Sequence, residues 1–328
     1  MSSSRLVLVA GATGRQGGAV VDALLRRGHR VRALTRRPGG AEAARLRARG
    51  VEIAAAGAAD RGDQGDRGDR GDADRADRCA GALLRAARGV DAFFAVTAPD
   101  PRGAEQGAGR AAREIERGIA QIDAAVAARV PHLVLSTIAS ADRATGIPTF
   151  EAKLAVERRA RASGVPLTII APVLFMENLI APACAADLSQ GRISLPLPAA
   201  RSLQHIAVAD IGGFAASMIE RGDAVVGRRF DIAGDELTGE QAACILSDVI
   251  GRRIRYRARP PALAADRDED AARMFEWLDR TGHEAAIEDL RDDFPEVGWH
   301  DFETWARRQD WSALDRGGGI HAAPAPPA

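Results

Sequence analysis

The residue with the clearest chemical potential is Lys153, the only lysine in a chain of 328 residues with 45 basic side chains. The other 44 basic residues (45 − 1) are therefore arginines. Arginine supplies surface charge as well as lysine does, but only lysine carries a compact ammonium group that acts in acid–base chemistry. The position of this single lysine in an arginine-biased sequence, on a helix described below, favours a chemical role over chance.

A second chemical feature is a glycine pattern near the N-terminus. Gly11, Gly14 and Gly17 form G-x-x-G-x-x-G between a short apolar run and a helical pattern. In such a turn the first glycine allows a tight bend, the second lets the backbone approach a pyrophosphate, and the third lets the helix pack on the strand. The N-terminus of the helix then offers free N–H groups to the phosphates. The pattern therefore predicts a dinucleotide-binding turn.

The end of the next predicted strand indicates which dinucleotide binds. An acidic residue there would hydrogen-bond the adenosine ribose of NAD and repel a 2′-phosphate. The sequence instead has Arg36 and Arg37, with no acid before Glu42. Guanidinium groups pair well with phosphate, and Arg15 in the glycine turn adds a further cation. The pattern predicts NADP(H) in preference to NAD(H), with solvated surface arginines as the alternative explanation.

Strands and helices alternate along the part of the chain that must position these residues. Apolar and β-branched runs predict strands at residues 6–10, 30–35, 51–54, 90–96, 131–136 and 166–172. Helical periodicity predicts helices at residues 19–25, 41–49, 110–129 and 149–163. This alternation predicts an α/β fold, a doubly wound parallel Rossmann sheet over residues 4–171. Residues 172–312, where all four tryptophans lie, are expected to form a smaller α+β substrate lobe interleaved with it.

Two segments of low complexity interrupt or follow this pattern. Residues 60–78 consist almost wholly of Asp, Arg and Gly with a period near three, which predicts a disordered insertion after the third strand. Residues 313–328 are rich in Gly, Pro and Ala and predict a disordered tail.

Composition excludes several classes of function. The formal net charge is zero, so no global field attracts nucleic acid or an anionic membrane. Three cysteines without a CxxC pair indicate a reducing compartment, no disulfide framework and no structural metal site. The N-terminus does not resemble a signal peptide, and no apolar run approaches the ~20 residues of a membrane span. We therefore expect a soluble, cytoplasmic protein.

The surroundings of Lys153 match half of a known catalytic pair. In the short-chain dehydrogenase/reductase superfamily, Tyr-x-x-x-Lys lies on the helix after the fifth strand, and the spacing puts both groups on one face. Here Thr149 occupies the tyrosine position, and the only tyrosine, Tyr256, lies far along the chain. A tyrosinate acid or base is therefore not available at the usual place.

Several stretches of the chain together resemble the NmrA-like family of atypical short-chain dehydrogenases. They are GATGRQGGAVVDALLRRGHRVRALTR, VPHLVLSTIASAD, TGIPTFEAKLAVERRARASGVPLTIIAPVLFMENL, IAVADIG and FDIAGDELTG. The similarity spans about residues 5–312, apart from the insertion. It implies an NAD(P)-binding Rossmann domain with a small C-terminal lobe. Members of the family include NADP(H)-binding redox sensors and reductases of quinones, azo compounds or phenylpropanoids, and they typically lack the tyrosine.

The resemblance also implies roles for particular residues. The pyrophosphate would be held by Gly11, Thr13, Gly14, Gln16 and Gly17, with Arg15 beside them, and the 2′-phosphate by Arg36. The cofactor would be flanked at the ends of the fourth and fifth strands by Thr97, Ala98, Ser136 and Thr137. The nicotinamide and substrate side would be lined by Pro172, Phe175 and Asn178, and Asp60 would be the candidate for the adenine. Lys153 would bind the nicotinamide ribose and act as a proton donor or relay.

Two classes of function are consistent with these features. The favoured one is an NADPH-dependent reductase that transfers a hydride to a small conjugated acceptor such as a quinone, which needs no strong protein acid. The alternative is a non-catalytic sensor of the NADPH/NADP ratio that acts through a regulatory protein partner. A nucleotide-sugar epimerase or dehydratase is disfavoured by the missing tyrosine. The acceptor is not identified by the sequence, and a homodimer is left open.

Overall fold

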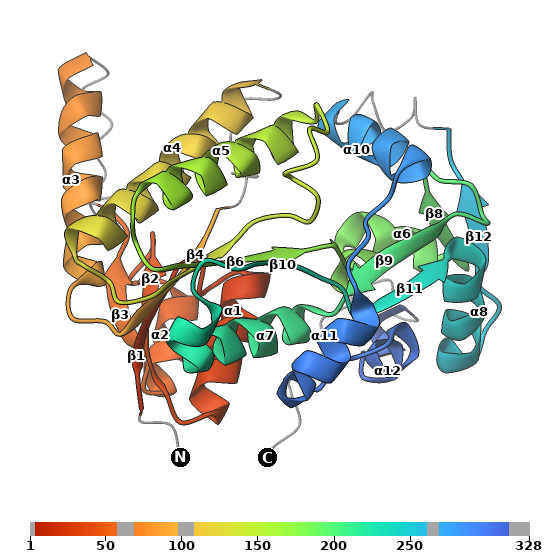
Figure 1. The fold of residues 1–328 in the computed structure, drawn as a ribbon. Coiled ribbons are helices and arrows are strands. Elements are labelled where there is room, and N and C mark those ends of the chain that lie inside the picture. Colours follow the sequence, from red (N-terminus) through yellow and green to blue (C-terminus); the bar gives the residue numbers. More distant parts are fainter. Residues whose placement is uncertain (1–3, 58–68, 98–107, 261–268, 315–328) are drawn as a thin grey trace. The chain divides into compact units, whose positions relative to one another are not determined.

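The computed structural model describes residues 4–57, 69–97, 108–260 and 269–314 of the chain (Figure 1). The chain divides into two compact units that alternate along the sequence. The first unit contains Met1–Thr137, Glu151–Ala171 and Ile211–Phe230, and the second contains Ile138–Phe150, Pro172–Asp210 and Asp231–Ala328.

The first unit is built on a seven-stranded sheet in the order β10-β6-β5-β4-β1-β2-β3. The strands are β1 (Leu6–Val9), β2 (Arg30–Thr35), β3 (Glu52–Ala55), β4 (Ala92–Val96), β5 (Leu133–Ser136), β6 (Leu167–Pro172) and β10 (Arg229–Ile232). All neighbouring pairs from β3 to β6 are parallel. The predicted Rossmann-like α/β fold is therefore confirmed, and the carboxyl ends of these strands meet at one edge of the sheet.

Helices cover both faces of this sheet. They are α1 (Arg15–Arg26), α2 (Ala41–Ala48), α3 (Asp69–Ala87), α4 (Ala108–Ala127), α5 (Pro148–Ala162) and α7 (Val208–Arg221), followed by the 3₁₀ turn η2 (Gly222–Val225). Figure 1 shows α3, α4 and α5 on one face and α1 and α7 on the other. Coverage on both sides explains why the central strands β1, β4, β5 and β6 are continuous apolar runs rather than alternating ones.

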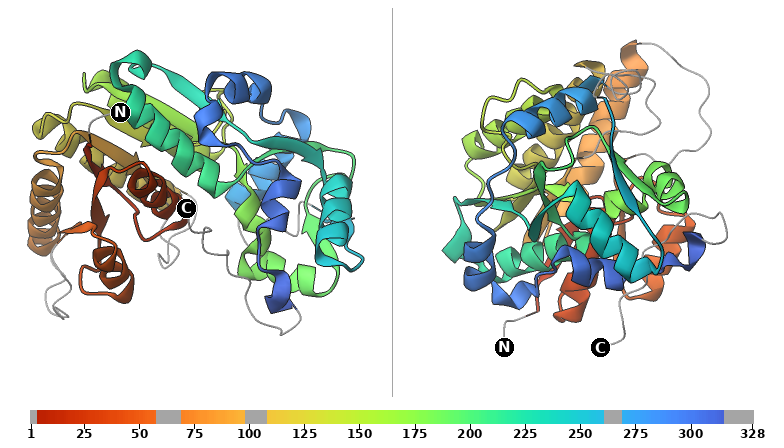
Figure 2. Two further views of the ribbon diagram at one scale, coloured as in Figure 1. Left: turned by 90° about the horizontal axis from the view of Figure 1, so that it is seen from below. Right: turned by 90° about the vertical axis from the view of Figure 1, so that its right-hand side faces the viewer.

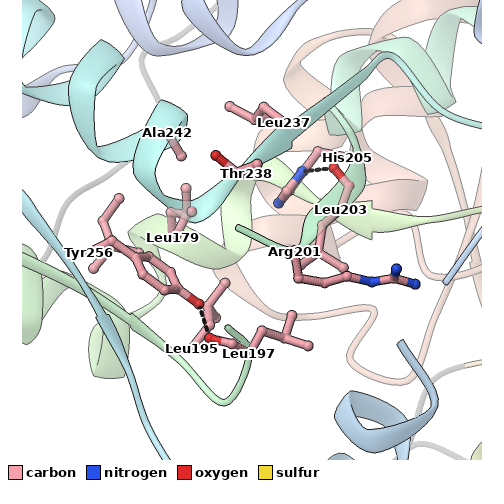
Figure 3. Close-up of a pocket in the computed structure, with 12 residues that line it drawn as sticks. Leu179, Leu195, Leu197, Arg201, Leu203, His205, Leu237, Thr238, Ala242 and Tyr256 are labelled. Carbon is pink, nitrogen blue, oxygen red and sulfur yellow. Dashed lines mark hydrogen bonds between the residues drawn. The ribbon is translucent and has the colours of Figure 1, made fainter. Parts of the chain in front are cut away.

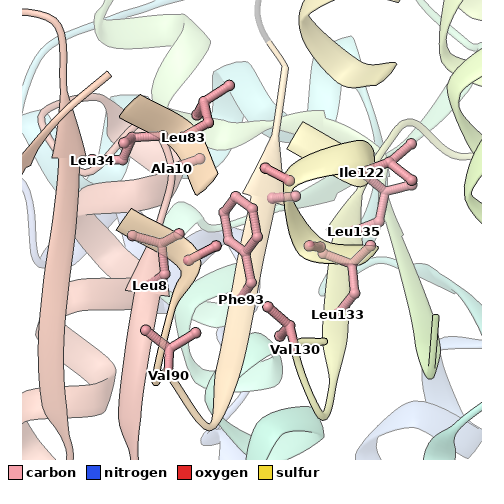
Figure 4. Close-up of a cluster of buried hydrophobic side chains, with 14 of the residues drawn as sticks. Leu8, Ala10, Leu34, Leu83, Val90, Phe93, Ile122, Val130, Leu133 and Leu135 are labelled. Carbon is pink, nitrogen blue, oxygen red and sulfur yellow. The ribbon is translucent and has the colours of Figure 1, made fainter. Parts of the chain in front are cut away.

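The core under α3, α4 and α5 follows the two-residue period of the strands. Leu8, Phe93 and Leu135 point to this face and are almost fully buried, as Figure 4 shows. Ile122 of α4 packs against them. Because the sequence contains few aromatic residues, small side chains such as Ala86, Ala125 and Ala160 fill much of the remaining space.

Helix α7 lies outside the predicted boundaries of the Rossmann domain, but from Ile211 onward it belongs to the first unit. A side chain at Gly212 would place its Cβ 2.4 Å from the carbonyl oxygen of Ala19 in α1, so the two helices touch backbone to backbone. The Arg5 guanidinium also donates hydrogen bonds to the carbonyls of Ile219 and Glu220. The predicted boundary at residue 171 therefore cuts off residues 211–230, which complete this unit.

The second half of the Asp/Arg/Gly-rich segment at residues 60–78 belongs to a helix in the structure. Helix α3 begins at Asp69, so residues 69–78 are helical, while residues 60–68 lie outside the described ranges. The buried residues Leu83, Ala86 and Ala87 fix the C-terminal half of this helix on the sheet. Once that half is formed, each added residue gains a backbone hydrogen bond, so the helix extends back through a polar sequence. Its N-terminal part projects beyond the other helices of the unit (Figures 1 and 2).

The second unit mixes short strands and helices. Its strands are β7 (Leu174–Phe175), β8 (Arg192–Leu195), β9 (Ser202–Ile206), β11 (Asp235–Thr238) and β12 (Arg255–Ala258), which form sheets in the orders β11-β9-β7 and β12-β8. Its helices are η1 (Met176–Ile180), α6 (Pro182–Ser189), α8 (Gly239–Ile250), α10 (Glu269–Arg280), α11 (Ile287–Asp293), η3 (Pro295–Val297), α12 (Phe302–Arg307) and η4 (Trp311–Leu314). The predicted tail thus begins inside η4, and residues 315–328 lie outside the described ranges.

No helix within the described ranges is both long and apolar enough to cross a membrane. Among the same residues, no group of three or more His, Cys, Asp or Glu side chains is arranged to hold a metal ion.

Candidate functional site

The glycine turn after β1 has the geometry that the motif predicts. Gly11 has a φ of +63°, a left-handed conformation that favours glycine, and its carbonyl accepts a hydrogen bond of 2.8 Å from the N–H of Gly14. Gly11, Thr13, Gly14 and Arg15 are exposed. The backbone of this turn is therefore open to a ligand.

The third glycine of the motif is required by packing. A Cβ at Gly17 would lie 2.2 Å from the carbonyl oxygen of Gly11, so α1 rests directly on the turn. The first turn of α1, Arg-Gln-Gly-Gly, contains no acidic residue that would oppose an anion. The positive end of the helix dipole therefore meets the exposed turn without a competing carboxylate in that turn.

Gln16 joins this turn to the end of β5. The hydroxyl of Ser136, the last residue of β5, donates a 2.7 Å hydrogen bond to the Gln16 Oε1. Ser136 is buried, whereas Gln16 is partly exposed. Two residues predicted to hold different parts of the cofactor are thus connected in the first unit.

The neighbouring residue Thr137 is tied to the core instead. Its hydroxyl donates a 2.7 Å hydrogen bond to Oε1 of the buried Glu157 on α5. Arg229 pairs with the other oxygen of Glu157 at 3.2 Å. The hydrogen bond between Thr137 and Glu157 fixes the segment that follows β5.

The predicted phosphate-binding arginines lie just beyond the end of β2. Arg36 and Arg37 are both exposed, and they follow the buried Thr35. The Thr35 hydroxyl accepts a 3.1 Å hydrogen bond from the N–H of Arg37, which shapes the turn. Because β2 pairs with β1 in parallel register, this turn and the glycine turn leave the same edge of the sheet. The arrangement suits recognition of a phosphate on the adenosine ribose.

Lys153 lies in a buried network at the same edge of the sheet. Its Nζ lies 2.6 Å from Oε1 of Glu114 on α4 and donates to the carbonyl oxygen and the hydroxyl of Thr97 at 2.6 and 2.8 Å. The Thr97 hydroxyl in turn donates to Glu114 at 2.9 Å. Lys153 and Glu114 are only 7% and 2% exposed, so the pair is shielded from water.

This geometry explains why the position carries the only lysine. The three acceptors converge on one nitrogen, and an ammonium group has three protons that can point to them. A planar guanidinium spreads its donors over a wider fork and cannot satisfy the same cluster. The three acceptors also mean that every proton of Lys153 has a partner within the protein.

Glu114 was missed by the sequence reasoning, although a signal for it exists. It looks like a surface charge in the stretch AREIERG, but it stands four, seven and eight residues before Gly118, Gln121 and Ile122. These residues form the buried stripe of α4. The helical period therefore places the carboxylate on the inner face.

Other predicted site residues are not brought into this cluster. Ala98 and Asp60 lie outside the described residues. Pro172 ends β6, Phe175 lies in β7 and Asn178 in η1, and all three belong to the second unit. Their contact with a cofactor stays a prediction.

The residues around the expected tyrosine position have other roles. The Thr149 hydroxyl donates a 3.1 Å hydrogen bond to Oδ2 of Asp270 in α10. Tyr256 lies in β12, donates to the carbonyl of Leu197 at 2.8 Å, and packs its ring on Gly239. Burial raises the pKa of Tyr256 to about 12. The only tyrosine is thus a structural residue of the second unit.

Tyr256 also lines a narrow pocket within the second unit (Figure 3). The leucines around it include Leu179, Leu203 and Leu237. The cavity volume is about 20 Å³, enough for about one water molecule. This pocket is therefore too small for an organic acceptor.

Two buried histidines, His132 and His205, have structural surroundings. His132 hydrogen-bonds with the Thr168 hydroxyl at 2.9 Å, and His205 with the carbonyl of Leu203 at 2.9 Å. Burial disfavours the charged imidazolium and lowers the pKa of each to about 4. Both are therefore neutral near pH 7.

Comparison with known proteins gives a match along nearly the whole chain. The model of the NmrA-like family matches residues 3–306. The (4-alkanoyl-5-oxo-2,5-dihydrofuran-3-yl)methyl phosphate reductase of Streptomyces griseus subsp. griseus is 31% identical over 292 residues. The matched region covers 86% of this chain and 90% of that protein.

Solved structures share the fold at lower identity. The Citrobacter sp. triphenylmethane reductase complexed with NADP(H) has a TM-score of 0.71 at 18% identity, covering 92% of this chain and 98% of that chain. An NADPH-dependent quinone oxidoreductase from Escherichia coli has a TM-score of 0.68 at 20% identity, with coverage of 92% and 98%. NmrA, a negative transcriptional regulator, in complex with NADP has a TM-score of 0.68 at 19% identity, with coverage of 93% and 94%.

Proposed function

Because the chain belongs to the NmrA-like family, we propose that it is an NADPH-dependent reductase of small acceptors whose carbon–carbon double bond is conjugated to a carbonyl. The observation that carries this proposal is a cofactor turn with a buried lysine nearby but no tyrosine in the catalytic position, since Thr149 stands there. Such a site suits an acceptor that takes a hydride without a strong protein acid.

The residues of the first unit fit a phosphorylated dinucleotide. The exposed backbone of Gly11 and Gly14 and the open N-terminus of α1 suit the pyrophosphate. Arg36 suits a 2′-phosphate. Lys153, fixed at the end of β4, would bind the nicotinamide ribose, and Ser136 would lie beside it. When bound, NADPH supplies a hydride from its nicotinamide ring.

The choice of acceptor is supported by the reductase of Streptomyces griseus, which is 31% identical. The compound in its name contains a ring alkene conjugated to both a lactone carbonyl and an alkanoyl group. A hydride added to the β carbon of such an alkene leaves an enolate on a carbonyl oxygen. A proton from solvent then adds to the α carbon, so no protein acid is consumed. A quinone also accepts a hydride without a protein acid: the hydride adds at one carbonyl oxygen, the electrons pass through the ring to the other oxygen, and a proton from solvent completes the hydroquinone.

The proposal is tested by titrating the purified protein with NADPH and NADH, followed by NADPH oxidation with an alkanoyl-substituted unsaturated lactone and with a quinone. We expect tighter binding of NADPH than of NADH and acceptor-dependent oxidation. Preference for NADH would contradict the role of Arg36. Tight NADPH binding without oxidation by either acceptor would contradict the reductase function.

A second candidate function is a redox sensor that binds NADP(H) and acts through a protein partner. It is favoured by the likeness to NmrA, a regulator. It is also favoured by Lys153, whose three ammonium protons all have acceptors within the protein. A sensor would bind NADPH and NADP with different affinity and show no turnover with any acceptor.

A further inference from the structure

We propose that Glu114 is a positioning residue that holds the Lys153 ammonium where a bound cofactor needs it. This inference rests on the proposed function, because it concerns the same NADPH site. Glu114 lies on α4 and has no described contact with the glycine turn, so it acts on the cofactor only through Lys153 and Thr97.

The first argument is geometric. Lys153 has four carbons between its backbone and its charge, and each freely rotating bond would spread the position of Nζ. Three acceptors from Thr97 and Glu114 fix the nitrogen at distances of 2.6 to 2.8 Å. Of these, the Glu114 carboxylate alone carries a charge. It therefore makes the strongest contribution to fixing the ammonium group.

The second argument concerns how the carboxylate reaches the lysine. One turn further along both helices, Gly118 of α4 meets Val156 of α5, where a Cβ at residue 118 would lie 2.5 Å from the valine side chain. This close approach brings the short glutamate side chain of α4 within reach of α5. The close contact between Gly118 and Val156 and the ion pair between Glu114 and Lys153 are therefore two parts of the same helix–helix interface.

The third argument concerns charge. An ammonium buried to this degree needs a counterion, since an unpaired charge in the interior is strongly unfavourable. Glu114 supplies it while the Thr97 hydroxyl, which donates to the same carboxylate, holds that carboxylate in place. When a ribose hydroxyl takes one proton of Lys153, Glu114 and the Thr97 carbonyl still hold the other two. The lysine can therefore bind a cofactor without leaving its position.

The test is a double-mutant cycle read by NADPH affinity and by urea unfolding. The variants are Glu114→Gln, Glu114→Asp, Lys153→Met and Glu114→Gln/Lys153→Met. The matched control is Glu116→Gln, which removes an exposed carboxylate from the same helix. NADPH binding is followed by the fluorescence of the nicotinamide, and unfolding shows that each variant is folded.

We expect Glu114→Gln to weaken NADPH binding roughly tenfold, as for loss of a hydrogen bond to a charged group. Glu114→Asp should recover part of the affinity because it keeps the charge. In the Lys153→Met background, Glu114→Gln should have no further effect on affinity, and the double variant should unfold at a higher urea concentration than Glu114→Gln alone.

Two outcomes would overturn the inference while leaving the proposed function intact. One is a folded Glu114→Gln variant that binds NADPH within twofold of the unaltered chain. The other is an equal effect of Glu114→Gln with and without Lys153, which would mean that Glu114 does not act through it. Failure of the unaltered chain to bind NADPH would overturn the proposed function and this inference with it.

Discussion

At the scale of single residues, arginine and lysine occupy different kinds of position in this chain. Arginine covers the surface and borders the predicted phosphate site, while the one lysine is buried where three acceptors converge. The sequence predicted a role for Lys153 from its rarity and its place on α5. It did not predict Glu114 or the link between Ser136 and Gln16, because these partners come from different elements and their pairing depends on packing.

Arg36 carries the prediction of cofactor preference. Replacing it with glutamate, Arg36→Glu, should weaken NADPH binding at least tenfold, because a carboxylate repels the 2′-phosphate. NADH binding should be unchanged or tighter. The matched control is Arg30→Ala at the opposite end of β2, where an exposed arginine pairs with Glu52. Equal dissociation constants for NADPH in Arg36→Glu and the unaltered chain would remove the basis for NADP preference.

Lys153→Arg keeps the positive charge but changes the shape of the donor group. We expect loss of stability of about 1–3 kcal/mol, the usual cost of overpacking a core, together with weaker NADPH binding. Urea unfolding and NADPH titration measure the two effects. A variant as stable as the unaltered chain and with the same affinity would show that the lysine has no special geometry and that its rarity is a compositional accident.

At the scale of elements, the order of strands and helices in the first unit follows from sequence patterns, and its parallel sheet is as predicted. There are two exceptions. The N-terminal part of α3 has a polar sequence, and α7 is separated from α1 by nearly two hundred residues. The N-terminal part of α3 extends from the buried C-terminal half of the same helix, and α7 is held by the approach of Gly212 to Ala19, neither of which a local pattern contains.

Helix α1 provides a test of how an element positions the site. In Gly17→Ala the new methyl group would overlap the Gly11 carbonyl, which is backbone and cannot move aside. We expect a loss of stability of about 3 kcal/mol or more and loss of NADPH binding. The matched control is Gly18→Ala. Its new Cβ would lie 3.7 Å from the carbonyl oxygen of Ala12, and alanine has a higher helix propensity than glycine. Similar unfolding midpoints for the two variants would contradict the packing of α1 on the turn.

At the scale of the whole molecule, buried histidines link stability to pH. The pKa of His132 and of His205 is lowered to about 4 in the folded chain. Between pH 6.5 and 4 the unfolded chain therefore binds more protons, so each histidine lowers stability as pH falls through this range and has no such effect above it. The raised pKa values of the buried carboxyls Glu177 and Asp210 act in the opposite direction.

Because the groups oppose one another, the prediction is made for a variant. His205→Asn should reduce the loss of unfolding free energy between pH 7 and pH 5 by about 1 kcal/mol per pH unit at most, whatever its effect on stability at pH 7. Urea unfolding at several pH values measures the slope. The control Arg45→Ala, at an exposed residue, should leave the slope unchanged. An unchanged slope in His205→Asn would contradict the lowered pKa.

The membership of the chain in the NmrA-like family, predicted from its motifs, is confirmed by the match over residues 3–306. The acceptor was not predictable, because the second unit is built from short strands and loops whose conformation a sequence pattern does not fix. The motifs that identify the family therefore do not identify the acceptor.

The central claim is that a hydride passes from NADPH to a conjugated acceptor on this protein. The most direct measurement supplies NADPH deuterated on one face of the nicotinamide and then on the other, with an alkanoyl-substituted unsaturated lactone, and locates deuterium in the product by mass spectrometry and NMR. We predict transfer from one face only, to the β carbon, with the α proton drawn from water. If the protein binds NADPH tightly but transfers no deuterium to the lactone, and a quinone does not oxidise the bound NADPH either, the claim would be contradicted and the sensor would be favoured.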